Sequence, residues 1–274
     1  MNEVLSSWPI VLALTGTGVL AGVLAGLLGV GGGIVIVPVL YFLMQGFGVS
    51  AASAMAIATS TSLAIIVPTA ISSVRAHYRK GNVDVELLKF WGAIILLAAI
   101  FGSLIANAVS GTFLTWMFGI IAVLVSINML FRSGAPALFP TLPGKPGQAL
   151  MATSVGGLSV MVGIGGGTIG VPLLTSFNVA AHRAVGTAAA FGLLIALPGA
   201  LTLMVVGETP MDAPVGTWRL LNLPALALIV PLTVLFAPVG AWLGAKLNAK
   251  ELKKAFAVVL FFTGTRMLIQ AAGV

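Results

Sequence analysis

The sequence predicts an all-α polytopic membrane protein, built as two inverted-topology repeats of five apolar segments each. Three observations predict this fold: the composition, the recurrence of apolar segments along the chain, and the similarity of the two halves. Hydrophobic residues make up 59% of the 274 positions and charged residues only 7%, whereas an average soluble domain carries roughly 25% charged residues. Most of the surface must therefore face lipid.

Ten apolar segments can be distinguished, and a transmembrane helix needs about 20 such residues. The predicted segments are 10–28, 34–44, 51–74, 87–108, 112–131, 149–162, 168–177, 184–206, 223–247 and 255–272. The second and seventh are too short to cross about 30 Å of hydrocarbon as straight helices. Each follows a glycine cluster, so we expect short half-helices or re-entrant segments at both places.

The two halves share landmarks in the same order. Residues 29–33 read Gly-Val-Gly-Gly-Gly and are followed by Pro38, and residues 163–167 read Gly-Ile-Gly-Gly-Gly and are followed by Pro172. Two further pairs are residues 56–59 with 184–187, and Asn128 with Arg266. This order indicates an internal duplication. We expect a first transmembrane repeat at 1–132, a cytoplasmic linker at 133–147 and a second repeat at 148–274.

Basic residues orient the repeats. Cytoplasmic loops of membrane proteins are enriched in Lys and Arg. One orientation places eleven of the thirteen basic residues inside: Arg75, Arg79, Lys80, Lys89, Arg132, Lys145, Arg183, Lys246, Lys250, Lys253 and Lys254. The loop 207–222, with Glu208 and Asp212, then lies outside, although it corresponds to the basic loop 75–89. Equivalent loops on opposite faces predict inverted repeats, with both termini periplasmic in a bacterial inner membrane.

The N-terminal residues 1–4 lack the basic region of a cleaved signal peptide, so we expect the first apolar segment to remain in the mature protein. The net charge of +7 is assigned to the cytoplasmic loops and not to nucleic-acid binding. The chain has no cysteine, which excludes thiol catalysis and thiolate metal sites. Two distant histidines and no carboxylate inside a segment leave no catalytic constellation. We therefore expect no enzyme, no metal and no cofactor.

The absence of carboxylates inside the segments disfavours a cation substrate, because cation pumps and proton relays place Asp or Glu inside the bundle. An anion is favoured instead. The glycine clusters, with Gly31, Gly32, Gly33, Gly165, Gly166 and Gly167, are candidate substrate-binding residues. A helix that starts after such a cluster presents free N–H groups and a positive dipole end to an anion. The alternative is that these glycines only allow close helix packing; a dinucleotide motif is excluded because no acidic residue follows about twenty positions later.

Polar residues inside the segments are further candidates. Arg266 is the only charge well inside a segment and is a functional candidate by default, although it could also snorkel to the outer headgroups. Its counterpart in the first half is Asn128. Thr59 and Thr187 offer hydroxyl groups that could bind substrate or bond to their own backbone carbonyls.

The two histidines differ in their surroundings. His182 and Arg183 stand at a segment start, where they could contact substrate or belong to an interfacial loop. His182 could also carry a proton, because its reference pKa is near neutrality. His77 lies in the basic loop and is expected to be solvated.

The doubled Gly-x-Gly-Gly-Gly element with its following Pro-x-Leu resembles the TauE/SafE family of sulfite and organosulfonate exporters. The stretch from His182 to Thr187 also matches the family's His-x-Ala-x-x-Thr pattern. The resemblance covers residues 11–270. The first half departs from the pattern, because Ala54 stands where the second half has His182. The resemblance implies secondary transport of a small sulfur-containing anion, with members that differ in substrate and in direction.

We therefore expect a secondary active transporter of a sulfur oxyanion or organosulfonate, such as sulfite or sulfoacetate, working in export. No nucleotide-binding P-loop occurs, so ATP is not its direct energy source. The alternatives are a passive anion channel and a membrane assembly factor with no substrate. The expected partners are the anion and the lipid bilayer, and a coupling proton or sodium ion and a homodimer remain open.

Overall fold

The computed structural model describes residues 8–132, 136–246 and 249–273. The predicted position of the N-terminus, at residues 1–4, and part of the predicted linker, at residues 133–135, lie outside the described residues. The described chain forms ten helices and one short hairpin: α2 Trp8–Leu28, α3 Gly33–Gly46, α4 Ala51–Arg79, α5 Val85–Ala108, α6 Gly111–Phe131, α7 Lys145–Met161, α8 Gly167–Ser176, α9 Ala181–Val206, β1 Thr217–Trp218, β2 Leu221–Asn222, α10 Leu223–Lys246 and α11 Ala249–Ala271. Each predicted segment coincides with one helix.

Helix length follows the predicted pattern in part, because α7, with 17 residues, and α11 are not among the candidate membrane spans of the described residues. Six helices are long and apolar enough to cross a membrane: α2, α4, α5, α6, α9 and α10. Helices α3 and α8 have 14 and 10 residues, so they rise only about 21 Å and 15 Å at 1.5 Å per residue. The chain is thus a polytopic membrane protein, and the second and seventh segments are as short as predicted.

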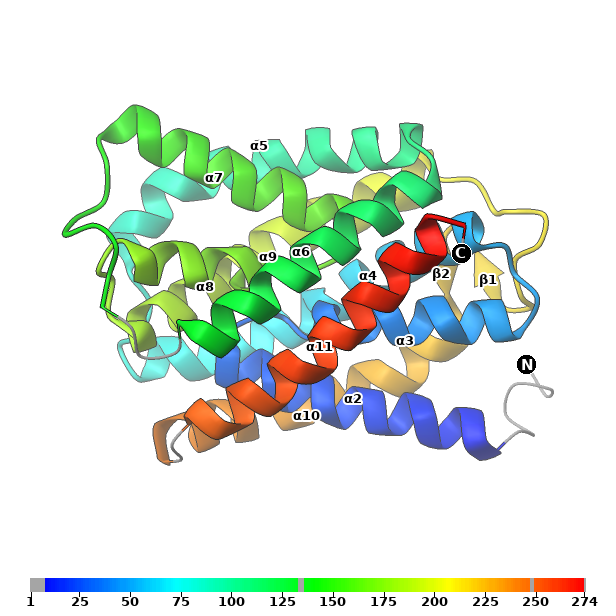
Figure 1. Cartoon of the computed structure of the whole chain (residues 1–274), viewed down its shortest axis with the longest axis horizontal. Helices are drawn as coiled ribbons and strands as arrows, with labels where there is room; N and C mark the ends of the chain where they lie inside the picture. The colour runs from blue at the N-terminus through cyan, green and yellow to red at the C-terminus, as the bar shows by residue number, and fades with distance from the viewer. Residues whose placement is uncertain (1–7, 133–135, 247–248, 274) are drawn as a thin grey trace.

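The connections gather at two ends of the helix bundle (Figure 1). One end, on the right of the view, carries the β1–β2 hairpin, the start of α2 and the end of α11. We call it the hairpin end. The other end carries the α4–α5 connection, the ends of α6 and α10 and the starts of α7 and α11. Most basic residues of the sequence lie in or beside these segments, and we call it the basic end.

The two halves are interleaved rather than separate. Helix α2 packs along α10, and α7 packs along α5, so the first helix of each half lies against the fourth helix of the other. Helices α4 and α9 pack against each other, as do α6 and α11. Each of these four helix pairs joins the first half to the second. The core is therefore built from both halves together.

Left-handed backbone conformations recur in both halves. Gly29 and Gly163 have φ of 68° and 70°, and each ends the turn after the first helix of its half. Asn178 (φ 62°) follows α8 where Gly48 (φ 83°) follows α3. The third such pair is Gly81 with φ 69° and Arg219 with φ 56°. A residue other than Gly is uncommon in this region. The glycine clusters themselves differ, because Gly32 has φ 80° and Gly166 has φ −60°.

Helix α4 lies at the centre and uses its polar residues to satisfy carbonyl groups of its neighbours. The prolyl ring of Pro238 removes the hydrogen bond that the Val234 carbonyl would otherwise accept. The Ser72 hydroxyl donates to that carbonyl at 3.0 Å. The Thr69 and Thr233 hydroxyls lie 2.7 Å apart. The Ser72 bond thus replaces the backbone hydrogen bond that Pro238 removes from α10.

The loop 207–222 is tied to the first half at the hairpin end. The Asp212 carboxylate accepts the backbone N–H of Ser50 at 2.8 Å. Hydrogen bonds from the Ser53 side chain and from Ser50 lower the pKa of Asp212 to about 2. Asp212 therefore stays charged at the start of α4, where a negative charge complements the helix dipole.

This arrangement predicts the sides from which two exposed positions react. Tyr78 is 65% exposed near the basic end and Met211 fully exposed near the hairpin end. In this cysteine-free chain, an impermeant maleimide should label Met211→Cys in intact cells and label Tyr78→Cys only after permeabilisation. Labelling of both single cysteines from the same side would contradict a bundle that crosses the membrane between these ends.

Candidate functional site

The two glycine clusters are in direct contact at the centre of the bundle. A Cβ atom on Gly33 would lie 2.5 Å from the Gly163 carbonyl oxygen. A Cβ atom on Gly167 would lie 2.0 Å from the Gly29 carbonyl oxygen. Each half-helix thus begins against the carbonyl of the other cluster. We call residues 29–33 and 163–167 the glycine clasp.

The other four predicted glycines are also packed closely against neighbouring atoms. A Cβ on Gly165 would lie 2.5 Å from the Val30 carbonyl oxygen, and one on Gly166 would lie 2.5 Å from Cβ of Phe191. Gly31 faces Gly165, and Gly32 faces the Ala21 carbonyl. All are buried. Close packing therefore accounts for these four glycines in this conformation.

A cavity of about 430 Å³ reaches the clasp from the basic end. Its polar lining residues are Asn128, Arg132, Thr168, Thr175, Ser176 and Asn178, and its apolar ones include Val30, Ile34, Met129, Val171, Val185 and Phe256. Gly167, the first residue of α8, also lines it. No carboxylate is among its lining residues, and Arg132 is positively charged, so this cavity suits an anion.

A second cavity, of about 330 Å³, reaches the same region from the hairpin end. Its polar lining residues are Thr59, Asn107 and Glu208, and the ends of α5 and α9 form its walls. A Cβ atom on Gly163 would lie 2.7 Å from Cα of Thr59. The second cavity therefore ends beside the clasp, opposite the first.

One unsatisfied hydroxyl lies at the clasp end of each cavity. Thr168 is 1% exposed and Thr59 is 2% exposed, and neither Oγ1 atom has a hydrogen-bond partner. A buried hydroxyl without a partner costs free energy. Neither oxygen is exposed to water in this conformation, and Thr168 lies at the N-terminus of α8.

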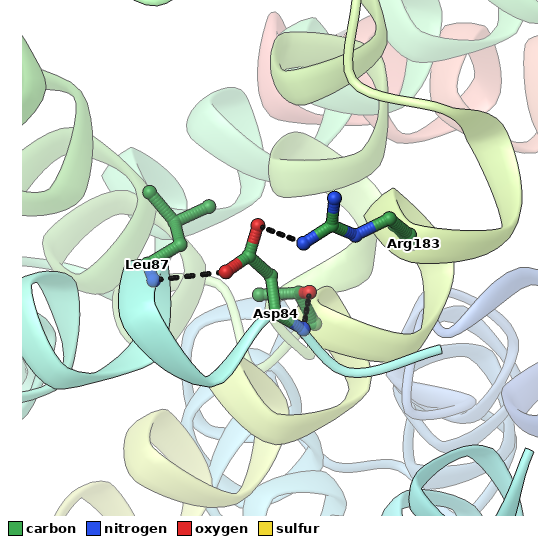
Figure 2. A network of polar contacts seen from close by, with 4 residues as sticks. Asp84, Leu87 and Arg183 are labelled. Atoms are coloured by element: carbon green, nitrogen blue, oxygen red, sulfur yellow. Dashed lines mark hydrogen bonds and ion pairs between the residues drawn. The ribbon is translucent and has the colours of Figure 1, made fainter. Parts of the chain in front are cut away.

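Thr187 and Arg183 belong to a different group of contacts (Figure 2). The Asp84 carboxylate accepts the Leu87 N–H at 3.1 Å and pairs with the Arg183 guanidinium at 2.8 Å. The backbone N–H of Asp84 donates to the Thr187 hydroxyl at 2.8 Å. Both predicted residues thus hold the start of α5 and line neither cavity.

A similar contact joins the start of α10 to α4. Asn222 accepts the N–H of Ala225 at 3.0 Å at the start of α10, and its own N–H donates to the Thr61 hydroxyl at 2.9 Å. Thr61 on α4 therefore does what Thr187 does on α9. The sequence pairing of Thr187 with Thr59 is two residues out of register.

The other predicted residues are spread over the bundle. Asn128 lines the basic-end cavity. His182 is exposed in the first turn of α9, outside both cavities. Arg266 is exposed on α11, with its guanidinium 4.7 Å from the ring centroid of Phe42. The structure therefore does not bring His182 or Arg266 to the clasp.

The expectation that His77 is solvated is wrong. His77 is 5% exposed, and its Nε2 lies 2.8 Å from the Gly26 carbonyl oxygen. Helix α4 extends to Arg79 and carries His77 into the bundle. Sequence reasoning also missed the hydroxyl of Thr168, although this residue directly follows the second glycine cluster.

An all-helical membrane bundle in which two cavities approach a central pair of broken helices is the architecture of a membrane transport protein. The model of the family described as "Sulfite exporter TauE/SafE" matches residues 14–267. The chain belongs to this family. No solved structure matches the chain.

Three curated relatives are similar over nearly their whole length. A "Probable membrane transporter protein" of Haemophilus influenzae is 29% identical over 92% of this chain and 96% of its own. A relative of the same description from Bacillus subtilis is 29% identical over 92% and 95%. One from Methanocaldococcus jannaschii is 25% identical over 92% and 93%. The protein is a membrane transporter.

The clasp predicts a sharp difference between two glycine substitutions. Gly167→Ala places a methyl group against the Gly29 carbonyl and should lower the stability by about 1–3 kcal/mol or more, as overpacking does. Gly16→Ala, on α2 with nothing within 4 Å of the added atom, should leave the stability unchanged or raise it by up to about 1 kcal/mol. Thermal unfolding in detergent measures both. Equal melting temperatures would show that the clasp does not restrict position 167.

Proposed function

We propose that this transporter is a secondary active carrier of a small anion, a sulfur oxyanion or an organosulfonate, and that it works in export. The observation that carries the proposal is the pair of cavities that approach the glycine clasp from opposite ends. A carrier needs access from both sides of the membrane to one barrier, and both cavities end at that barrier. The family description supports the sulfur-containing substrate.

The substrate site lies at the clasp end of the basic-end cavity. Gly167 and Thr168 begin α8, and the Thr168 amide already donates to the Gly165 carbonyl at 3.4 Å. The Gly167 amide and the Thr168 hydroxyl can therefore donate to anion oxygens. A helix N-terminus stabilises an anion by about 0.3–1 kcal/mol, and by up to about 2 kcal/mol when partly buried. Asn128 and Arg132 line the route from the basic end. An apolar wall beside this polar group leaves space for the carbon chain of a sulfonate.

Alternating access explains how the anion crosses the clasp. We infer that the two halves are inverted repeats, supported by the matched contacts of Asp84 with Thr187 and of Asn222 with Thr61. Movement of one group of helices, drawn from both halves, against the remaining helices would open the clasp toward one cavity and then the other. Thr59 would receive the anion on the hairpin side. The basic residues favour a cytoplasmic basic end in a bacterial inner membrane, with periplasmic termini.

A passive anion channel is the second candidate, because the same cavities could form a pore. The close contact within the clasp favours a carrier, since a channel would need an open path. Saturable flux that runs against an anion gradient in proteoliposomes distinguishes the carrier, and flux that only follows the gradient would establish the channel. An assembly factor would bind no anion in either assay.

Thr168→Val tests the site directly. Valine keeps the shape of threonine and removes the hydroxyl, so the fold should persist. A hydrogen bond to a charged group is worth about 1.5–3 kcal/mol, so sulfite affinity should fall about 10- to 100-fold. The readout is the rise in melting temperature on titration with sulfite, thiosulfate, taurine and sulfoacetate, since a bound ligand stabilises the folded state.

The matched control is Thr263→Val on α11, where the hydroxyl donates to the Val259 carbonyl at 2.8 Å and lines neither cavity. This variant should bind like the wild type. An unchanged anion response in Thr168→Val would remove Thr168 from the site. No stabilisation of the wild type by any of the four anions would contradict the proposed substrate class.

A further inference from the structure

His77 is a buried titratable residue at a junction of three helices. It lies on the last turn of α4, and its Nε2 contacts the carbonyl of Gly26 near the end of α2 at 2.8 Å. Gly26 packs so closely on α10 that a Cβ atom there would lie 1.8 Å from the Ala237 carbonyl oxygen. The Ser73 hydroxyl donates to the next α2 carbonyl, that of Ala25, at 3.3 Å. Two α4 side chains thus cap α2 just before Gly29.

The contact defines the protonation state of His77 in this conformation. A carbonyl oxygen only accepts hydrogen bonds, so Nε2 carries the hydrogen and donates it to Gly26. Nδ1 is buried without a hydrogen-bond partner. A proton added there would create a charged group with a buried N–H and no acceptor, which is costly. His77 is therefore neutral while α2 and α4 remain packed.

The charged groups around this junction do not compensate such a proton. Helix α2 contains no titratable residue, and residues 223–244 of α10 contain none either. On α4 itself, Arg75 and Arg79 are exposed, and Lys80 donates to the Ala241 carbonyl at 2.8 Å. All of these charges are positive, and no described carboxylate pairs with His77.

The equivalent junction in the second half is apolar. Thr187 lies 126 positions after Thr61, the residue with the similar contact. The same offset pairs Ser73 with Gly199 and His77 with Leu203. A Cβ atom on Gly199 would lie 2.4 Å from a methyl group of Val160 on α7, and Leu203 is 2% exposed. Only the first half therefore places an ionisable side chain where its broken helix ends.

We propose that His77 is the proton-binding site that couples anion transport to a proton gradient; this rests on the proposed carrier function. A proton from the basic end can bind Nδ1 only when the junction of α2 and α4 opens to water. Protonation thus favours the open junction, and loss of the proton restores the packed one. Because Gly29 follows Gly26 by three residues, a movement of this helix end is transmitted to the glycine clasp.

The first test needs no substrate. The chain has two histidines, so His182→Gln leaves His77 as the only one. Nitrogen-15 NMR of histidine-labelled His182→Gln in liposomes should show a neutral ring with the hydrogen on Nε2 at pH 8, and a doubly protonated ring on acidification. A ring that stays neutral down to pH 5, or carries its hydrogen on Nδ1, would overturn the proposal.

The second test separates coupling from transport. Proteoliposomes are assayed with radiolabelled sulfite for exchange at equal pH, and for accumulation driven by a pH gradient. His77→Gln keeps a donor for the Gly26 carbonyl but cannot bind a proton, so exchange should persist and gradient-driven accumulation should fall at least tenfold. His182→Gln, exposed and outside both cavities, should retain both activities.

Each result has one meaning. Wild-type accumulation by His77→Gln would overturn the coupling role, as would wild-type exchange that ignores the pH gradient. Both results would leave the proposed carrier function intact. Absence of any sulfite exchange by the wild type would instead count against the proposed function, and the NMR titration would still decide whether His77 binds a proton.

Discussion

The structure depends on one steric constraint, the contact between two backbone carbonyls and two glycines at the centre of the bundle. Gly33 lies against the Gly163 carbonyl, and Gly167 lies against the Gly29 carbonyl. Any side chain would force these segments apart. The contact sets where α3 and α8 begin, and it divides the interior into two cavities. A transporter needs a barrier that blocks free passage but can separate during transport. Noncovalent backbone contacts between glycines form such a barrier.

The two halves show similar helix contacts but differ in chemistry. Helix α4 carries a row of hydroxyls and His77 along its buried face, whereas the corresponding face of α9 is mostly apolar. The basic-end cavity has Arg132 and no carboxylate, and the hairpin-end cavity has Glu208. Under the proposed alternating access, the unequal side chains would give the two conformations different affinities for an anion and a proton. A difference of this kind is required for a ligand to shift a two-state equilibrium.

The sequence predicted the helices well, because apolar segment length and glycine clusters act locally. It predicted the short α3 and α8 and identified the glycines that form the clasp. It failed for His77, since residues 75–79 look like a basic loop and only tertiary packing shows that α4 continues through them. It also could not show that Thr187 is used by Asp84, which is 103 positions away. Hydroxyl groups bond to whichever partner the fold supplies, and that partner is not visible in local sequence.

The most direct test of the account is a structure of the protein with its anion bound, determined by electron cryomicroscopy in lipid nanodiscs with saturating sulfite. We expect density for the anion within hydrogen-bonding distance of the Thr168 hydroxyl and the Gly167 amide, at the clasp end of the basic-end cavity. Density at the membrane surface, far from both glycine clusters, would contradict it even if transport itself were confirmed.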